Sequence, residues 1–537
     1  MTGSLLDGGP AVPPGLDTLG EALLRAARSD GPEGIRFIHQ DGTESSLGYR
    51  ELLDDAARIL AGLRAGGARP GQTVVLQVGR DPELLAAFWA CVLGGFVPMP
   101  VSAAAADAPS LLHRVWQGYG RPWVVTGSGQ PVAAETVADP RWAGALLGDT
   151  RALLGHAPDR SWHRAAPEDT AVLLLTSGST GVPKAVVLTH RNILSRTAAT
   201  ALANRLGRAT RSFNWMALDH VGGLVMFHVR DVFLGCHQVH ARTAWVLADP
   251  LRWLDAVHRH RIDTTWAPNF AFGLINDRAG RLAGRDWDLS RLRYIMNGGE
   301  AIRGRVVRRF LELLAPFGLP GDAMHPGWGM SETSAGVVDC EFTAVTAAGA
   351  DDRHVPAGRP QPGTAVRVVD DAGEPVPEGT LGRLQAGGAS ITGGYFRNPA
   401  QNRQSFTPDG WFKTGDLARI EGGVLTVTGR ADDLIQLGEV TCYGHEIEAA
   451  VEELDFVEPS FTVACLVDDD QLAVFYHPRA AAPGGDPARA VRARVAERLG
   501  VEPAHVLEVA REEIPKTGIG KLRRAQLRDR FEALRTA

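Results

Sequence analysis

The segment AVLLLTSGSTGVPKAVVLTHRNIL, residues 171–194, says more about fold and chemistry than any other part of this chain. An apolar strand is expected to lead into a run of small hydroxyl residues and glycines at 176–181. Pro183 and Lys184 follow, and then a second apolar strand. Glycine permits positive φ and a close approach of the backbone, so several N–H groups can converge on an anion. Together with the hydroxyl donors and the charge of Lys184, the segment predicts a cradle for a triphosphate.

The spacing of this loop differs from that of the Walker loop. The Walker pattern places four residues between its first glycine and a Gly-Lys pair, and Ser or Thr follows the lysine. Here Lys184 follows Pro183 and precedes Ala185, and the next residues are strand-like. A kinase-like or Walker ATPase is therefore disfavoured. For the segment by itself, a solvated Ser/Gly turn between two strands stays open as an alternative.

The segments around the loop alternate between strand and helix patterns. Apolar runs such as TVVLQV (73–78) and RLRYIMNGG (291–299) are separated by amphipathic stretches such as YRELLDDAARILAGLRAGG (49–67). Strand, helix and strand in this order favour a parallel sheet with helices on its faces. The predicted fold class is therefore α/β, with a large N-terminal domain built of α/β sheets.

Changes in composition suggest the boundaries of the parts. Residues 1–15 are rich in Gly and Pro and are predicted to be disordered, so the large domain is expected at 16–428. Short strands joined by turns predict a β-rich subdomain at about 355–428. Helices and strands alternate again from 433 to 537, which predicts a small α+β C-terminal domain.

Composition and charge narrow the function classes. Of 537 residues, 44% are hydrophobic and 22% are charged, which excludes an intrinsically disordered chain. The net charge of −6 argues against nonspecific nucleic-acid binding, so no nucleic acid is expected as partner. Five separated cysteines argue against a disulfide framework and a cysteine-rich zinc site. Neither a signal peptide nor a membrane-spanning run is recognisable, so we expect a cytoplasmic protein without a membrane partner.

Four further motifs follow in order. They are NGGEAI (297–302), PGWGMSET (326–333), WFKTGDLARI (411–420) and EEIPKTGIGKLRRAQL (512–527). Adjacent glycines can form a flat floor for a purine, a carboxylate can accept hydrogen bonds from both ribose hydroxyls, and a glycine-flanked lysine can deliver a point charge. Each motif by itself also has an ordinary interpretation, respectively a strand-to-helix turn, a core tryptophan beside a surface glutamate, a β-turn and a basic tail. Their order along one chain is more specific than any one of them.

From about residue 20 to the C-terminus the chain resembles the adenylate-forming superfamily, which comprises acyl-CoA synthetases, luciferases, peptide-synthetase adenylation domains and acyl-AMP ligases. The run TSGSTGVPKAVVLTH (176–190) matches the signature loop of that family, with Ala185 where Gly is more usual. The overall look is closest to stand-alone acyl-AMP ligases of polyketide or nonribosomal peptide pathways. The resemblance implies ATP-dependent activation of a carboxylic acid to acyl-AMP with release of pyrophosphate, and ATP and Mg²⁺ as cofactors.

The resemblance also implies roles for individual residues. Trp328 is expected near adenine, Ser331 (Thr in relatives) at phosphate, Glu332 at Mg²⁺ and Asp416 at the ribose. The expected catalytic residues are Thr176, His220, Glu332 and Lys521, the last matching the adenylation lysine. The expected nucleotide-binding residues are Thr176, Ser177, Gly178, Ser179, Thr180, Gly181, Lys184, Gly298, Gly299, Glu300, Trp328, Gly329, Met330, Ser331, Asp416, Arg430 and Lys521.

The segment FNWMALDHVGGLVMFHVRDVFLG (213–235) resembles the part that lines the acyl pocket in relatives. His220 lies where relatives place a gate, although a buried structural histidine is an alternative. Gly222 and Gly223 are expected to leave the pocket wall open. Relatives that activate amino acids bind the ammonium with an Asp, and Asp219 is one place off, so a standard α-amino acid is not favoured. The expected substrate-binding residues are Asp219, His220, Gly222, Gly223, Trp266, Asn269, Phe270, Asn297 and Met330.

The resemblance further implies a hinge at 429–432, with Asp432 as pivot, and a mobile C-terminal lid domain at 433–537. Gln436 stands where many relatives have Lys, in the loop that contacts the thiol acceptor. We expect the acyl group to pass to the phosphopantetheine thiol of a separate carrier protein. The alternatives are CoA, a different nucleophile acting on an aryl acid, and, from another class, a catalytically silent nucleotide-binding scaffold.

Overall fold

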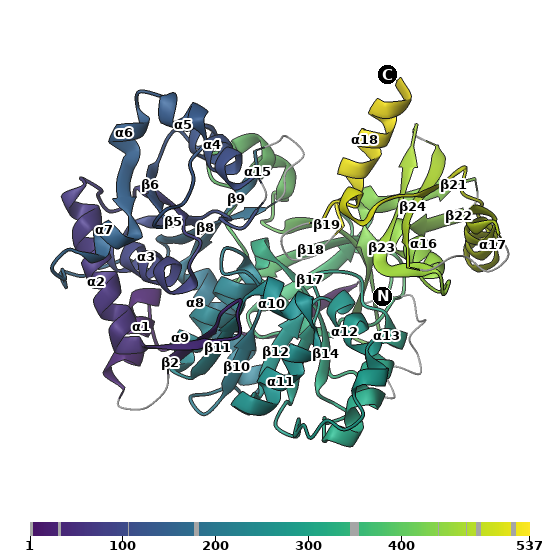
Figure 1. Cartoon of the computed structure of the whole chain (residues 1–537), viewed down its shortest axis with the longest axis horizontal. Coiled ribbons are helices and arrows are strands. Elements are labelled where there is room, and N and C mark those ends of the chain that lie inside the picture. Colours follow the sequence, from purple (N-terminus) through teal and green to yellow (C-terminus); the bar gives the residue numbers. More distant parts are fainter. Residues whose placement is uncertain are drawn as a thin grey trace.

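The computed structural model describes residues 4–29, 34–105, 107–176, 182–343, 354–438, 440–468, 470–479, 485–516 and 522–536. A large N-terminal body carries most of the sheets, and a smaller C-terminal part lies at one side of it (Figure 1). The predicted α/β class, with a large N-terminal domain and a small C-terminal α+β region, is confirmed.

A nine-stranded sheet forms the centre of the body. In spatial order its strands are β16 (Arg359–Pro360), β15 (Ala335–Asp339), β14 (Met324–Met330), β13 (Tyr294–Asn297), β12 (Thr264–Ala267), β10 (Arg211–Asn214), β11 (His237–Ala241), β2 (Gly34–Ile38) and β3 (Glu44–Gly48). The strands from β14 to β2 pair in parallel, and antiparallel pairs flank them on both sides. Parallel strands need covered faces, which explains the apolar runs of the sequence.

A second, four-stranded parallel sheet lies beside the first. Its order is β5 (Val97–Pro100), β4 (Thr73–Gln77), β6 (Trp123–Thr126) and β7 (Leu146–Asp149). The antiparallel ribbon of β8 (Thr170–Thr176) and β9 (Lys184–Thr189) contains the predicted phosphate loop, and Thr176 and Lys184 face each other in its register. Residues 177–181 of that loop lie outside the described residues.

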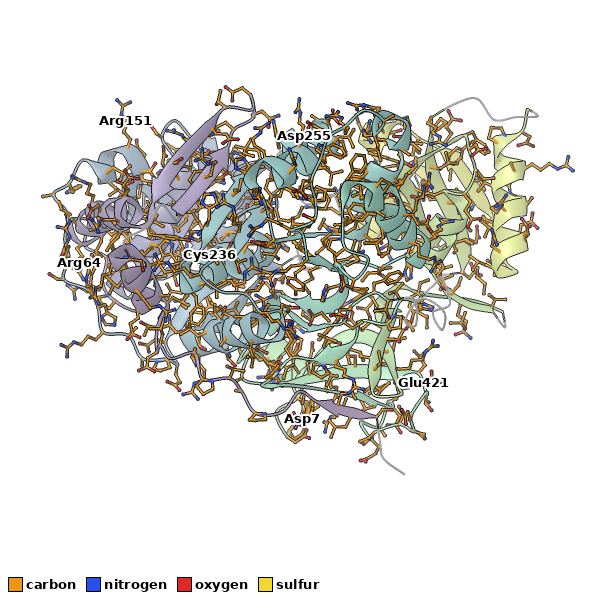
Figure 2. The ribbon with its side chains drawn as sticks, turned by 90° about the horizontal axis from the view of Figure 1, so that it is seen from below. Asp7, Arg64, Arg151, Cys236, Asp255 and Glu421 are labelled. Atoms are coloured by element: carbon orange, nitrogen blue, oxygen red, sulfur yellow. The ribbon has the colours of Figure 1, made fainter. Side chains whose placement is uncertain are left out.

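Helices fill the space around both sheets. Helix α3 (Asp81–Gly94) is buried along its whole length from Leu84, which matches the unbroken apolar sequence LLAAFWACVLGG. Helix α2 (Tyr49–Ala65) packs against it. Figure 2 shows Cys236, a fully buried residue, among the packed elements, whereas Arg64 and Arg151 lie at the outer margin. No helix within the described ranges combines the length and apolar character that a membrane span requires.

The β-rich subdomain is one antiparallel sheet with an unexpected edge strand. Its order is β1 (Leu5–Asp7), β17 (Thr364–Val369), β18 (Gly382–Gly388), β19 (Phe412–Glu421) and β20 (Val424–Arg430). The prediction that residues 1–15 are disordered is therefore wrong for the described part, because Leu5 pairs with Arg367 and Asp7 with Ala365. An open sheet edge offers free backbone groups to any extended segment, and composition alone does not reveal such a partner.

The C-terminal part has its own sheet and its own cores. The hairpin β21 (Leu434–Leu437) and β22 (Val440–Tyr443) leads into α16 (Gly444–Val451). Strands β23 (Val457–Val467), β24 (Gln471–Pro478) and β25 (His505–Glu508) form the sheet, and α17 (Pro487–Leu499) and α18 (Arg524–Thr536) complete this part. Its separate cores are what a domain able to move as a unit requires.

A buried ion pair in the body lies next to strand β10 of the central sheet. The side chains of Arg230 and Asp231, at the start of α9 (Arg230–Leu234), are both 0% exposed, and Arg230 Nε donates to Asp231 Oδ1 over 2.9 Å. Ser212 of β10 also donates its hydroxyl to Asp231. Removing one partner of such a pair leaves an uncompensated buried charge.

We therefore expect Asp231→Asn to lower the free energy of unfolding of the body by about 3–5 kcal/mol. All 12 tryptophans lie before residue 412, so urea unfolding followed by tryptophan fluorescence reports on this part of the chain. The control is Asp249→Asn, which breaks an exposed pair with Arg281 of 2.8 Å and should cost less than about 1 kcal/mol. Equal losses for the two variants would contradict the buried-pair argument.

Candidate active site

A cavity of about 1840 Å³ opens at the carboxyl ends of the parallel strands, between the body and the C-terminal part. Ligands of open parallel sheets bind at this edge, because loops from several strands meet there. The cavity is lined by segments that are far apart in sequence. They include the β8–β9 ribbon, the end of β13, the second half of β14 from Gly327, and parts of β19 and β20. Leu522, Arg523 and Arg524 of the C-terminal part line it as well.

One end of the cavity gathers the charged groups predicted for phosphate. Thr176 and Lys184 lie there, and Thr176 Oγ1 donates to the carbonyl oxygen of Lys184 over 3.4 Å. Lys184 Nζ is 5.4 Å from the centroid of the Tyr395 ring. Ser177, Gly178, Ser179, Thr180 and Gly181 lie outside the described residues.

Glu332 is the acidic group at this end. It lies on the short 3₁₀ turn Ser331–Thr333 after β14 and is 5% exposed, and its carbonyl oxygen accepts a hydrogen bond of 2.8 Å from the N–H of Thr392. The Tyr395 hydroxyl donates to Glu332 Oε1 over 2.8 Å. Burial raises the pKa of Glu332, while the Tyr395 hydroxyl and the charges of Arg430 and Lys184 oppose that rise.

This donor set fits a divalent cation that is shared with phosphate. Within the described ranges, no group of three or more His, Cys, Asp or Glu side chains could hold a metal ion. Mg²⁺ commonly takes one or two carboxylates and completes its shell with phosphate oxygens and water. A single buried carboxylate beside two cationic side chains is compatible with that mode, so Glu332 would hold Mg²⁺ only together with a nucleotide.

The carboxylate of Asp416, which is predicted to bind the ribose, is held by two side chains. Trp328 Nε1 donates to Asp416 Oδ2 over 2.8 Å, and Arg430 Nη1 donates to Asp416 Oδ1 over 3.2 Å. Gly415 lies directly before Asp416 and has a φ of +78°. A Cβ at this position would lie 2.7 Å from Arg430 Nη2, so glycine is required. Strand pairing explains the meeting of the two residues, because Asp416 of β19 faces Arg430 of β20.

The predicted adenine turn forms part of the cavity wall. A Cβ on Gly298 would lie 2.7 Å from the carbonyl oxygen of Gly327, so the turn packs directly on β14. Glu300 Oε1 accepts from the N–H of Phe270 over 2.7 Å, in the first turn of helix α12 (Asn269–Asn276). An acidic group at a helix N-terminus is favourable, so Glu300 also stabilises that helix. Gly299, Gly329, Met330 and Ser331 line the same cavity.

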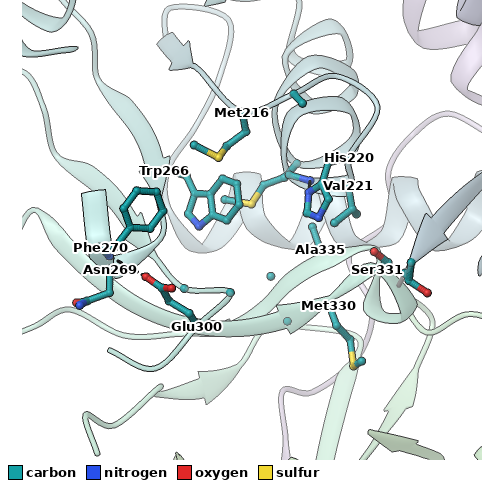
Figure 3. Close-up of a pocket in the computed structure, with 18 of the residues that line it drawn as sticks. Met216, His220, Val221, Trp266, Asn269, Phe270, Glu300, Met330, Ser331 and Ala335 are labelled. Atoms are coloured by element: carbon teal, nitrogen blue, oxygen red, sulfur yellow. Dashed lines mark hydrogen bonds between the residues drawn. The ribbon is translucent and has the colours of Figure 1, made fainter. Parts of the chain in front are cut away.

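The acyl-pocket residues lie along one side of the cavity (Figure 3). Met216, Trp266 and Phe270 supply apolar surface, and Asn269 Oδ1 accepts from Asn297 Nδ2 over 3.4 Å. His220 is held by its own turn, because its Nδ1 accepts from the N–H of Gly222 over 3.2 Å.

The expected open wall at Gly222 and Gly223 is not present. These glycines begin the π-helix η1 (Gly222–Val229). A Cβ on Gly222 would lie 2.4 Å from the Trp266 ring, and a Cβ on Gly223 would lie 2.2 Å from the carbonyl oxygen of Ala217. The Trp266 indole fills the space beside Gly222, and the backbone of Ala217 fills the space beside Gly223. The two glycines therefore permit close packing instead of an open wall.

Asp219 belongs to a polar cluster on another wall of the cavity. Burial raises the pKa of Asp219, while a hydrogen bond with Ser102 and the charge of Arg242 oppose that rise. Arg242 also pairs with Asp81, with 3.2 Å between Nη1 and Oδ1. Asp219 is therefore engaged with protein groups.

The structure adds residues that sequence reasoning missed. Tyr395, which bonds to Glu332, lies in GGYFRN, a stretch typical of a surface loop, so no sequence signal pointed to it. Met216 and Met296 also line the cavity; both lie in segments quoted above, but neither was singled out as a site residue. Lys521 lies outside the described residues, and Asp432 lines the cavity beside Arg430.

Comparison with known proteins agrees with these motifs. The sequence pattern described as AMP-binding enzyme matches residues 25–396. Aspulvinone E synthetase melA of Aspergillus terreus is 32% identical, with 95% of this chain and 58% of that protein covered. Atromentin synthetase of Tapinella panuoides is 30% identical, with 96% and 56% covered. The chain thus spans little more than half the length of these curated relatives.

Solved structures show the same fold. McyG A-PCP complexed with phenylalanyl-adenylate has 34% identity and a TM-score of 0.91, covering 98% of this chain and 97% of that one. The adenylation domain of a keto acid-selecting NRPS module bound to keto acyl adenylate has 36% identity and a TM-score of 0.74, covering 94% and 100%. With motifs, cavity and relatives in agreement, the chain belongs to the family of AMP-binding enzymes and is an AMP-forming acid ligase.

Proposed function

We propose that this enzyme uses ATP to convert a carboxylic acid to acyl-AMP and then passes the acyl group to the phosphopantetheine thiol of a separate carrier protein. The observation that carries the proposal is the meeting of Lys184, Glu332, Asp416 and Arg430 at one cavity, although these residues come from four separate segments.

In the first step a carboxylate oxygen attacks the α-phosphorus of ATP. A bond from oxygen to phosphorus forms, the bond to the bridging oxygen breaks, and pyrophosphate leaves with the electron pair. Such a displacement depends on holding the reactants in line and neutralising charge. Lys184, Arg430 and Lys521 supply positive charge, and Asp416 with Trp328 holds the nucleoside. Glu332 would hold Mg²⁺ together with the nucleotide, and the ion would supply Lewis-acid neutralisation of the phosphate charge.

The acid we propose lacks an α-ammonium group and carries an uncharged, apolar side chain. The acyl side of the cavity presents Met216, Trp266 and Phe270, and Asp219 is engaged with Ser102 and Arg242. One similar structure is that of a keto acid-selecting domain, so α-keto acids belong in any substrate panel beside aryl and fatty acids. An ammonium group in this pocket would need a carboxylate partner, and in this proposal Asp219 interacts with Ser102 and Arg242 instead.

A carrier-protein thiol is the proposed acceptor, with CoA as the alternative. Support comes from the similarity to McyG A-PCP, a structure that includes a carrier domain, and to nonribosomal peptide synthetases. Supplying either CoA or a pantetheinylated carrier protein to preformed acyl-AMP separates the two, since only the true acceptor should yield a thioester rapidly.

The decisive experiment is the exchange of labelled pyrophosphate into ATP across a wide panel of carboxylic acids. The proposal expects exchange that depends on one acid class and on Mg²⁺. If no acid supports exchange although ATP binds, the catalytically silent scaffold becomes the better interpretation. Release of ADP would indicate phosphoryl transfer instead.

Lys521→Ala should reduce pyrophosphate exchange by about 10²–10³-fold, as does the loss of one preorganised donor at a charged transition state. ATP affinity, measured by calorimetry, should change little, because the lysine acts on the reacting groups. An exchange rate equal to that of the unaltered enzyme would remove Lys521 from the mechanism.

Tyr395→Phe should move the pH dependence of Mg²⁺-nucleotide binding. The Tyr395 hydroxyl lowers the pKa of Glu332, so its removal raises that pKa further above the ordinary value. Only the ionised carboxylate binds a cation, so affinity is lost as pH falls through this pKa, and the loss should begin at a higher pH in the variant. Calorimetric titrations at several pH values test this, and identical pH profiles would refute it.

A further inference from the structure

Two arginines of the body meet two glutamates of the C-terminal part beside the cavity. Arg303 and Arg305 stand at the start of helix α13 (Gly304–Leu314), directly after the adenine turn. Glu452 and Glu453 stand at the end of α16, the helix that follows the β21–β22 hairpin. Each arginine pairs with one glutamate, so two ion pairs bridge the two parts of the chain.

The Arg303–Glu452 pair is short and shielded from water. Arg303 Nη1 donates to Glu452 Oε2 over 2.7 Å, and their side chains are 23% and 7% exposed. Glu452 Oε1 accepts a second hydrogen bond of 2.9 Å from the N–H of Ser460. Both carboxylate oxygens are therefore satisfied only while Arg303 is in place, and a shielded carboxylate that loses its cation is strongly destabilised.

The Arg305–Glu453 pair contributes less to holding the parts together. Arg305 Nη1 donates to Glu453 Oε1 over 2.6 Å, and its Nη2 donates over 3.2 Å to the carbonyl oxygen of Ala449, in the last turn of α16. Arg305 is 39% exposed, and Glu453 has two further cationic partners within its own part, Arg494 and Arg498. Exposed pairs are worth little, and Glu453 keeps partners when Arg305 is gone.

Arg303 also connects this contact to the cavity. Its backbone N–H donates to Asn269 Oδ1 over 3.2 Å, on the acyl side of the cavity. Glu452 also interacts electrostatically with Lys516, as does Glu300. In the sequence, Lys516 lies five residues before Lys521. The shielded pair thus adjoins Asn269, a residue predicted for substrate binding, and interacts electrostatically with Lys516.

We propose that the Arg303–Glu452 pair is a latch that holds the C-terminal part over the cavity. Arg303 and Glu452 would be positioning residues for adenylate formation, acting through the orientation of the C-terminal part, and this role rests on the function proposed above. The latch must open before acyl transfer, when water solvates both charged ends. Loss of one partner therefore destabilises the closed arrangement and leaves the open one unaffected.

The half-reactions test the latch against a merely structural role. Arg303→Met and Glu452→Gln should slow pyrophosphate exchange by about tenfold or more, the effect of about 1.4 kcal/mol. Transfer from preformed acyl-AMP to a pantetheinylated carrier should keep its rate or become faster. Arg303→Lys, which retains the charge, should recover part of the exchange. The control is Arg281→Met, whose ion pair with Asp249 lies wholly within the body and whose loss should change neither rate.

A distance measurement tests the latch without any substrate. Spin labels on Leu202→Cys in the body and Glu497→Cys in α17, two residues that are 62% and 69% exposed, report the separation of the two parts. In the otherwise unaltered chain we expect one narrow distance distribution, and in Arg303→Met or Glu452→Gln a broad one. Arg281→Met should keep the narrow distribution.

The outcomes separate the latch from the proposed function. An unchanged distance distribution in both latch variants, or an equal slowing of both half-reactions, would overturn the latch. Failure of every acid to support exchange in the unaltered enzyme would overturn the proposed function, and the spin-label distances would still decide whether the pair holds the two parts together.

Discussion

Parallel strands β12, β13 and β14 end at the same edge of the central sheet, and the chemistry of the enzyme depends on this alignment. The predicted adenine turn follows β13, and the turn with Glu332 follows β14, so the pairing of the strands places both at one cavity. Close packing of Gly298 on Gly327 keeps the two segments in register. The antiparallel β19–β20 pair adds Asp416 and Arg430 by the same principle, as cross-strand partners.

The walls of the cavity combine rigid and movable elements. Asp416 is fixed by Trp328 and Arg430, and Glu332 by Tyr395 and the backbone of Thr392, so both carboxylates are ordered by contacts within the protein. The C-terminal part, by contrast, has its own cores and meets the body through charged contacts. Water can solvate both ends of an ion pair when the pair separates, so these contacts are compatible with the proposed change of orientation between the two steps.

Much of the fold and the order of the motifs could be predicted from the sequence. Apolar runs alternating with amphipathic stretches predicted the α/β class, and turns after residue 355 predicted the β-rich subdomain. Two predictions were wrong for the same reason. Leu5–Asp7 is ordered by the edge of β17, and the space beside Gly222 is filled by Trp266, so distant partners decided both. The assignments of individual nucleotide and acyl ligands stay predictions that mutagenesis will test.

The sequence by itself determined the local chemistry, because hydroxyl residues, glycines and a lysine at fixed spacing have the same donors in any surroundings. These residues predicted a cradle for a triphosphate, and the resemblance to the adenylate-forming superfamily implied an acid-activating enzyme. Only the tertiary structure decided which groups act on one another. The bond from Tyr395 to Glu332 and the Arg303–Glu452 pair each join segments far apart in the chain. Such contacts depend on how strands and helices pack in space, and no spacing along the sequence encodes them.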